Sequence, residues 1–308
     1  MTAHGLMQEQ FAPPERVGFI GLGNMGAPMA GHLAAAGFAV VAADANPVAL
    51  QRFCSTVHCE RAESLAHLGR SCRVLITMLP DGAAVREVLM GDGGVAAGLA
   101  AGAVVLDMSS AEPVGTRALA RELAQGAISL VDAPVSGGVK RAVAGTLAIM
   151  AGGESAAIAR CQRILAPLGQ VFPAGASGCG HALKALNNYL SAVALAATAE
   201  AMMAGEKFGI DPAVMLEILN NSTGRNTATE QKYPAFILTG KFDSGFSLGL
   251  MAKDLRIALG LAEALGTPAG LLGECATLWG AAQRRLGFGA DNTEIVKYLA
   301  AAGRGERL

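Results

Sequence analysis

The sequence predicts an α/β fold, in which a doubly wound parallel sheet precedes an all-helical domain. Over roughly 130 residues, short runs that are apolar on both faces alternate with segments of helical spacing, as in a sheet covered by helices on both sides. From His181 onward the spacing is helical only. The chain has 308 residues, which exceeds a typical single domain, so we assign the two patterns to two domains.

Six runs in the first half are expected to be strands, because they are apolar and rich in β-branched residues. In chain order they are Arg16–Ile20, Phe38–Ala43, Arg73–Leu79, Ala103–Met108, Ile128–Val131 and Thr146–Ala151. Helical spacing covers Asn24–Ala36, residues 47–54, 81–89 and 112–125, and Glu154–Leu168.

The second half is expected to contain helices and no strand. The helices are His181–Phe208, Asp211–Asn220, Gly249–Leu265, Ala269–Arg285 and Thr293–Ala301. Asp211 followed by Pro212 is typical of a helix start, with an N-cap and then a proline at the first helical position. We therefore predict a flexible leader over residues 1–15, a first domain over 16–177 and an all-helical domain over 178–308.

Composition excludes several classes of protein. Lys and Arg number 24 against 25 Asp and Glu, so the chain has no electrostatic footprint for nucleic acid or for an anionic membrane surface. The apolar stretch Tyr189–Gly205 is interrupted by polar residues, which favours a buried helix over a membrane span. The six cysteines show no CxxC spacing and the N-terminus has no signal-peptide pattern, so we expect a cytoplasmic protein with reduced thiols. The five histidines have no metal-ligand spacing, so no metal is expected.

A glycine-rich turn follows the first strand and opens the first helix. Its residues have G-x-G-x-x-G spacing and are Gly21, Leu22, Gly23, Asn24, Met25 and Gly26. Such a turn lets the backbone approach a pyrophosphate, which the helix N-terminus then attracts. Asp44 stands 23 residues after Gly21, where an acid can accept hydrogen bonds from the adenosine ribose of NAD. The first domain is therefore predicted to bind a dinucleotide, NAD in preference to NADP; a glycine turn without a ligand is the alternative.

Four blocks in the chain resemble, in order, those of the β-hydroxyacid dehydrogenase family, which includes the 3-hydroxyisobutyrate dehydrogenases. The blocks are Phe19–Met29, Asp132–Gly138, Lys184–Asn188 and the pair Lys253–Asp254. The resemblance runs from Arg16 to Leu299 and implies a Rossmann-type sheet followed by an all-helical domain, which is entered through a long interdomain helix. It also implies an NAD(P)-dependent oxidoreductase that acts on a CH–OH group of a small carboxylate.

The segment Ser136-Gly137-Gly138 is expected to end the strand Ile128–Val131, at the sheet edge where ligands bind in open α/β folds. A hydroxyl beside two unhindered backbone N–H groups can hold a carboxylate. In the family that this chain resembles, the segment grips the carboxylate of the substrate, which makes Ser136 a catalytic-site residue as well. A turn whose glycines merely permit positive φ is the alternative.

Lys184 and Asn188 lie four residues apart, so they share one face of the helix that opens the second domain. Leu183, Leu186 and Leu190 are expected to desolvate the lysine, which would favour proton exchange with a substrate oxygen. The resemblance implies that Lys184 is the acid/base and that Asn188 holds the same oxygen. The alternative is a solvated lysine at a helix start.

Further contacts follow from the resemblance alone. Leu79 and Pro80 are expected near the adenosine half of the cofactor, Ser109 beside the nicotinamide ribose, and Lys253 with Asp254 over the cofactor from the helical domain. A surface ion pair is the alternative for Lys253 and Asp254. Phe246 is expected to wall the substrate pocket, although an ordinary core aromatic is the alternative. Lys140 and Arg141 are interpreted as solvated charges, and a contact to a second anionic group on the substrate is the alternative.

The residues and the resemblance together predict a dehydrogenase that transfers a hydride between NAD and a small β-hydroxy acid, or the matching semialdehyde, in a cleft between the domains. A homodimer or homotetramer is expected, because the helix His181–Phe208 is apolar almost all round. Two alternatives remain: an NADPH-dependent enzyme like the imine reductases, which lack the lysine, and a non-catalytic dinucleotide-binding scaffold.

Overall fold

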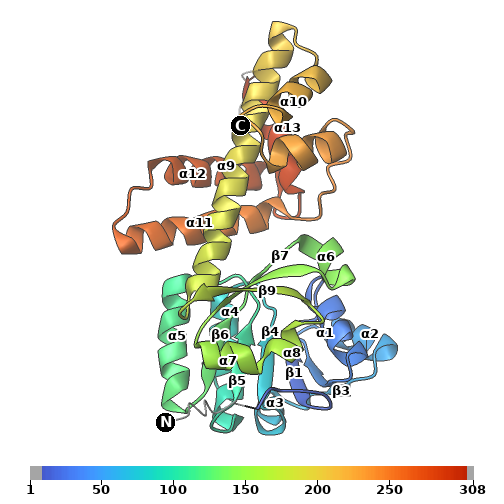
Figure 1. The fold of residues 1–308 in the computed structure, drawn as a ribbon, viewed down its shortest axis with the longest axis vertical. Helices are drawn as coiled ribbons and strands as arrows, with labels where there is room; N and C mark the ends of the chain where they lie inside the picture. The colour runs from blue at the N-terminus through green and yellow to red at the C-terminus, as the bar shows by residue number, and fades with distance from the viewer. Residues whose placement is uncertain (1–8, 304–308) are drawn as a thin grey trace, which may run out of the picture. The chain divides into compact units, whose positions relative to one another are not determined.

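A computed structural model describes residues 9–303, and the chain divides into two compact units at Lys184 and Ala185. The first unit holds a sheet with helices packed on it, and the second unit is built of helices (Figure 1). The described part thus confirms the predicted α/β fold class, with an all-helical part after it.

The sheet of the first unit has nine strands. They are β1 Arg16–Ile20, β2 Ala39–Ala43, β3 Glu60–Arg61, β4 Val74–Thr77, β5 Val104–Asp107, β6 Ser129–Asp132, β7 Val135–Ser136, β8 Leu147–Gly152 and β9 Gly169–Gly175. The hydrogen-bonded order is β3-β2-β1-β4-β5-β6-β8-β7, with β9 paired to β8. The first six strands are parallel and β8 runs antiparallel to β6 and β7. This is the doubly wound order whose switch point lies between β1 and β4.

Helices and turns connect the strands and cover the sheet. They are α1 Gly26–Ala35, α2 Pro47–Thr56, α3 Leu65–Ser71, α4 Gly82–Met90, η1 Val95–Gly98, α5 Pro113–Gln125, α6 Gly138–Ala144, α7 Ser155–Arg160 and α8 Gln162–Leu165. Alternate residues of each strand face opposite layers. Val17 and Phe19 of β1 belong to the cluster that also contains Met29 of α1, whereas Ile20 packs in the cluster that contains Leu119 of α5.

Several short elements of the first unit were missed or misplaced by the sequence. Ser136 does not end the strand at 128–131: β6 stops at Asp132, and Ser136 belongs to the separate strand β7, antiparallel to β8. The helix expected over Glu154–Leu168 is two helices that divide at Cys161. The strand β9 was not expected, because it contains a proline and carries glycine at both ends.

The expectation of a flexible leader was wrong for its described part. Phe11 is 1% exposed, and its N–H donates to the carbonyl of Arg160. The guanidinium of Arg160 lies 4.4 Å from the centroid of the Phe11 ring. Residues 1–8 of the expected leader lie outside the described residues.

The second unit contains the long helix α9 Cys179–Phe208, of which the first residues belong to the first unit. It is followed by α10 Pro212–Asn220, the π-helix η2 Ala228–Ile237, α11 Leu248–Leu265, α12 Gly270–Leu286, η3 Asn292–Glu294 and α13 Ile295–Gly303. Asp211 caps α10, as predicted, by accepting from the N–H groups of Ala213 and Val214. The fully buried Trp279 of α12 packs in one core with Leu195 of α9 and Leu255 of α11.

Within the described ranges, no helix is both long enough and apolar enough to cross a bilayer. The stretch Tyr189–Gly205 lies inside α9, which is a helix of the second unit's core, as expected.

Candidate functional site

The carboxyl ends of the parallel strands define the edge of the sheet at which ligands bind in this topology. The ends of β1, β4, β5 and β6 are Ile20, Thr77, Asp107 and Asp132. The glycine turn leaves this edge after β1, and α9 begins beside it after β9. The predicted site residues of the first unit gather around these strand ends.

The glycine turn has the backbone that a dinucleotide requires. Gly21 has a φ of 100°, and a Cβ there would lie 2.2 Å from the carbonyl oxygen of Met78. A Cβ on Gly26 would collide with the carbonyl of Gly21, so the third glycine is needed for the close approach of helix and strand. Gly23 is different, because a Cβ there would meet nothing within 4 Å. Open space in front of the second glycine is where a pyrophosphate would approach, so these residues fit the group.

Asp44 is held at the same turn by its two oxygens. Oδ2 accepts from the backbone N–H of Leu22 at 2.6 Å, and Oδ1 accepts from the N–H of Asn46 at 2.7 Å. A carboxylate has about four acceptor positions, so two remain for ribose hydroxyls. The side chain is partly buried, and its negative charge is fixed beside the backbone that would face the phosphates.

Ser109, which was expected beside the nicotinamide ribose, contacts the backbone of the turn after β4. Its side chain is fully buried, and its hydroxyl accepts from the N–H of Leu79 at 2.9 Å. The hydroxyl therefore holds the turn at Leu79 and Pro80. Pro80 is exposed and Leu79 is partly buried, so this turn presents surface to the edge of the sheet.

A buried polar network links the sheet edge to α9, and the sequence reasoning missed it. Asp132 accepts from the N–H of Gly178 at 2.7 Å and from that of His181 at 3.0 Å. The His181 ring contacts the Thr116 hydroxyl at 2.8 Å and the carbonyl of Ser109 at 3.2 Å, and its Nε2 lies 3.7 Å from Asp107. A signal was available, since Asp132 opens the block that ends at Gly138 and is a charge inside an apolar run.

Burial raises the pKa of Asp132, whereas the charge of His181 and the N–H groups of Gly178 and His181 lower it. The carboxylate is at once costly to bury and well supplied with donors. Because two of these donors open α9, Asp132 ties the start of that helix to the end of β6.

Lys184 follows His181 by one helical turn and is 7% exposed. The reason expected for its burial was wrong. Leu183, Leu186 and Leu190 are 46%, 40% and 68% exposed, because they lie on a different face of α9 from Lys184. Asn188, which shares the face of Lys184, is 6% exposed.

Asn188 has a buried partner that the sequence could not pair with it. Its Nδ2 donates to Asp254 Oδ2 of α11 at 2.5 Å, and its Oδ1 accepts from Asn187. Asp254 is 2% exposed, and its Oδ1, which has no hydrogen-bond partner, lies 3.7 Å from Lys253 Nζ. Asp254 thus orients Asn188, a contact that the sequence did not predict, and Lys253 is partly buried.

The segment after β7 has the backbone expected of it. Gly137 and Gly138 have φ values of 129° and 65°, and Ser136 is partly buried. Both positive φ values explain why glycine stands at these positions. Lys140 and Arg141, which follow in α6, are exposed. Phe246 in the second unit is partly buried, and its carbonyl accepts from Asn292.

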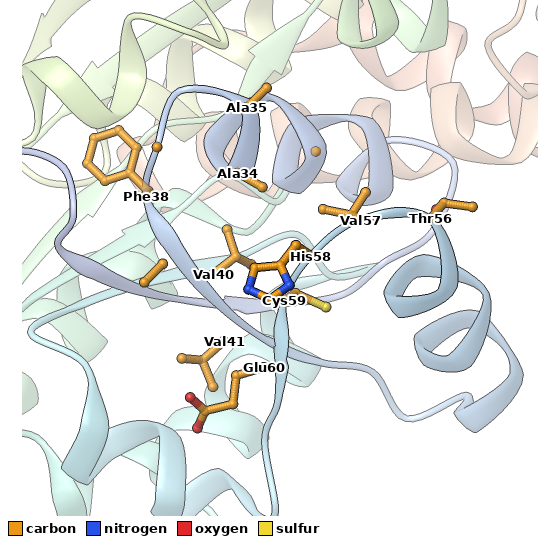
Figure 2. Close-up of a pocket in the computed structure, with 13 residues that line it drawn as sticks. Ala34, Ala35, Phe38, Val40, Val41, Thr56, Val57, His58, Cys59 and Glu60 are labelled. Atoms are coloured by element: carbon orange, nitrogen blue, oxygen red, sulfur yellow. The ribbon is translucent and has the colours of Figure 1, made fainter.

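Figure 2 shows a hollow at the other end of β2, away from the glycine turn. It has a volume of about 660 Å³, and its walls include Ala34, Phe38, Val57 and Cys59. None of the residues predicted for the site lines it. Among the described residues, no group of three or more His, Cys, Asp or Glu side chains could hold a metal ion.

Comparisons with known proteins agree with this arrangement. Residues 16–180 match the profile of the NAD-binding domain of 6-phosphogluconate dehydrogenase, and residues 178–299 match that of the NAD-binding domain of NADP-dependent 3-hydroxyisobutyrate dehydrogenase. The chain is therefore an oxidoreductase that uses a nicotinamide dinucleotide.

The chain belongs to the β-hydroxyacid dehydrogenase family. It is 41% identical to 2-(hydroxymethyl)glutarate dehydrogenase of Eubacterium barkeri over 79% of this chain and 81% of that protein. It is 37% identical to 3-hydroxyisobutyrate dehydrogenase of Pseudomonas aeruginosa over 83% and 89%. The structure of Mycobacterium tuberculosis 3-hydroxyisobutyrate dehydrogenase with L-serine has a TM-score of 0.88 and 31% identity, and covers 92% of this chain and 99% of that one. An imine reductase of Myxococcus stipitatus, 16% identical with a TM-score of 0.64, shares the fold.

Proposed function

We propose that this protein is an NAD-preferring dehydrogenase of a short β-hydroxy acid, with Lys184 as its acid/base and Asn188 and Ser136 holding the substrate. The observation that carries the proposal is the pair Lys184 and Asn188. Both are more than 90% buried, on one face of a helix whose first turn Asp132 ties to the end of β6. Burying polar groups costs free energy unless they are paired, and buried titratable groups cluster at functional sites.

In this proposal the dinucleotide supplies the hydride acceptor, and it would be held by the glycine turn and Asp44. The neutral amine of Lys184 takes the proton of the substrate hydroxyl, and in the reverse direction its ammonium returns a proton to the carbonyl oxygen. Asn188 has a second N–H on Nδ2, which can donate to the same oxygen while the first is held by Asp254. Ser136 and the N–H groups of Gly137 and Gly138 hold the carboxylate.

The preference for NAD rests on Asp44. Its carboxylate is anchored by Leu22 and Asn46, so it cannot easily turn away from a 2′-phosphate. The residues that follow it, Ala45, Asn46 and Pro47, offer no cation to such a phosphate. A solved relative that is 26% identical was determined with NADP+, so the choice of cofactor varies among similar folds.

The 3-hydroxyisobutyrate and 2-(hydroxymethyl)glutarate of the relatives' names share a CH₂OH group on the carbon that bears a carboxylate. The proposed substrate of this chain has the same β-hydroxy acid unit. The test is the rate of NAD reduction across about a dozen short hydroxy acids, compared as kcat/KM. Turnover of a β-hydroxy acid well above its α-hydroxy isomer supports the proposal. Tight binding of NAD without turnover of any of them would instead favour a non-catalytic scaffold.

We further propose that the chain assembles into a homodimer or homotetramer. Leu183, Leu186 and Leu190 are exposed at i, i+3 and i+7 of α9 and form an apolar stripe that a second copy would cover. Light scattering of the full chain measures its mass. Substitution of the stripe by Leu186→Lys with Leu190→Lys should lower that mass, and a wild-type monomer would contradict the proposal.

A further inference from the structure

A lysine in the second unit has no role in the site described so far. Lys232 lies in the π-helix η2, and its ammonium donates to Asn292 Oδ1 at 3.1 Å and to Ser191 Oγ at 3.4 Å. Both acceptors are neutral. The side chain is partly buried.

No carboxylate of residues 9–303 lies within ion-pair distance of the Lys232 ammonium. The charged group that acts on it is Asp291, but the oxygens of Asp291 already accept from the hydroxyls of Ser244 and Thr293 and from the N–H groups of Gly245 and Thr293. Burial lowers the pKa of Lys232 to about 8, so near pH 7 the group remains charged in an environment that disfavours charge.

The two neutral acceptors place this ammonium next to the proposed reaction site. Ser191 follows Asn188 by three residues and Lys184 by seven, so all three share one face of α9. From Asn188 to Ser191 the rise along the axis is about 4.5 Å. Asn292, the other acceptor, donates through its backbone N–H and its Nδ2 to the carbonyl of Phe246, the residue expected to wall the substrate pocket.

We propose that Lys232 binds a second carboxylate of the substrate, at the end distal to the reacting hydroxyl. The protein would then prefer dicarboxylic β-hydroxy acids, with the distal carboxylate at Lys232. One ammonium neutralises one carboxylate, whereas a phosphate dianion would leave a charge unbalanced. The Ser191 hydroxyl can turn to donate to the same carboxylate. The axial rise of about 4.5 Å from Asn188 to Ser191 suits an acid that is one or two methylenes longer than a three-carbon unit. This inference rests on the proposed hydroxy acid dehydrogenase activity.

The experiment compares acids that differ only in the distal group. The probes are 2-(hydroxymethyl)succinate, its homologue with one more methylene, the distal monoamide of each, and 3-hydroxyisobutyrate. The wild type should prefer at least one diacid over its monoamide by about ten- to a hundredfold in kcat/KM, as expected for a hydrogen bond to a charged group. Lys232→Met should remove that preference while keeping activity on 3-hydroxyisobutyrate within about threefold, and Lys232→Arg should retain part of it.

Lys241→Met is the matched control, because Lys241 is an exposed lysine nine residues further on in the same unit. It should leave the preference for diacids unchanged. Calorimetry supplies a readout without turnover: with NAD present, glutarate should bind the wild type more tightly than butyrate, and Lys232→Met should abolish the difference.

The outcomes separate this inference from the proposed function. The role of Lys232 would be overturned if the protein oxidises 3-hydroxyisobutyrate but acts on both diacids no more efficiently than on their monoamides. The proposed function would then still stand. An equal loss of activity on all probes in Lys232→Met would also overturn the role of Lys232, since a purely structural lysine would act without regard to the distal group. Absence of NAD reduction with every probe, while glutarate still binds through Lys232, would overturn the proposed function instead.

Discussion

Asn188 and Asp254 are joined by a hydrogen bond of 2.5 Å, although 66 residues separate them in the chain. The two residues come from different helices of the second unit, and both are buried. Because Asp254 can only accept when ionised, it fixes the amide of Asn188 with the nitrogen toward α11. The orientation of the amide, and with it the donor offered to a substrate oxygen, is set by this contact.

Asp254→Leu should lower kcat about tenfold and leave the Kd of NAD within about threefold, because the substitution frees Asn188 and touches no cofactor. Asn188→Ala should cause a loss of the same order. The double variant should be little worse than either single variant, since the two residues act as one unit. A large rise in the Kd of NAD in Asp254→Leu, measured by fluorescence titration, would instead support the cofactor contact expected from the sequence.

Lys184→Ala should lower kcat by roughly 10²–10⁴, the usual contribution of a general acid/base. The Kd of NAD should stay nearly unchanged, because the lysine acts on the substrate oxygen. Stopped-flow measurement of the first turnover separates this loss from slow product release. A variant that keeps most of its kcat would remove Lys184 from the mechanism, and Lys207→Ala, at the exposed end of the same helix, is the control.

Ser136→Ala should raise KM for the hydroxy acid more than it lowers kcat, because a carboxylate is bound alike in the ground state and the transition state. The measurement is a comparison of a hydroxy acid with the amide of its proximal carboxylate. The wild type should prefer the acid, and the variant should prefer it less. If the wild type treats both alike, the carboxylate is held elsewhere.

Asp44→Asn combined with Ala45→Arg should shift the preference from NAD toward NADP. In the wild type, the 2′-phosphate would meet a fixed carboxylate, which costs about ten- to a hundredfold in affinity. The variant replaces that repulsion by a guanidinium. The ratio of kcat/KM for the two cofactors is decisive, and a wild type that uses NADP as well as NAD would show that Asp44 does not face the ribose. Arg52, exposed on α2, is the group that could rescue the phosphate, so Arg52→Ala belongs in the same series.

The efficiency on a diacid, divided by that on 3-hydroxyisobutyrate, should fall as the pH rises through about 8. The pKa of Lys232 is lowered to about 8 by burial, so above this pH the free protein loses the ammonium that would hold the distal carboxylate. Taking the ratio cancels groups that serve both substrates, including Lys184. In Lys232→Met the ratio should be low and independent of pH. A wild-type ratio that is constant from pH 6 to 9.5 at fixed ionic strength would contradict the assignment.

The same shift has a consequence for stability. Between about pH 8 and 10.5, the unfolded chain holds a proton on Lys232 that the folded protein has released. The contribution of this site to the free energy of unfolding therefore rises with pH across that window. Below pH 8 both states are protonated and the cost of burying the charge is fully present. Between pH 7.5 and pH 9.5, the free energy of unfolding measured in urea should increase less, or decrease more, for Lys232→Met than for the wild type.

The strands β1, β2, β4, β5, β6 and β8 were predictable because they are largely buried and consist mainly of apolar residues. Arg16–Ile20 was located to the residue, and five others were placed within two residues at each end. The edge strand β9 could not be found, because Pro173 and the flanking glycines are signs of a loop in a sequence. The π-helix Ala228–Ile237 was missed for a similar reason, since it carries Pro234 in its interior.

For the candidate site, what could be predicted depended on how close the residues are in the sequence. Motifs that are contiguous, such as the glycine turn and Ser136-Gly137-Gly138, were visible, as was the pair Lys184 and Asn188 at helical spacing. Partners distant in the chain were not. Nothing in the sequence joins Asp132 to His181, or Lys232 to Ser191 and Asn292, because these contacts depend on how whole elements pack. The prediction that neighbouring leucines desolvate Lys184 was wrong because these leucines lie on a different face of the helix.

The anchoring of α9 by Asp132 has a consequence for building chimaeras between relatives. A junction just before Gly178 would take six residues from the same parent protein: Lys184, Asn188, Ser191, Lys232, Asp254 and Asn292. The specificity that these residues are proposed to set would therefore be transferred together. The recipient would have to supply an acid at the position of Asp132 to receive the N–H groups of Gly178 and His181. A junction placed inside α9, after Lys184, would instead combine a proton-transfer residue from one parent with an oxygen-holding amide from the other.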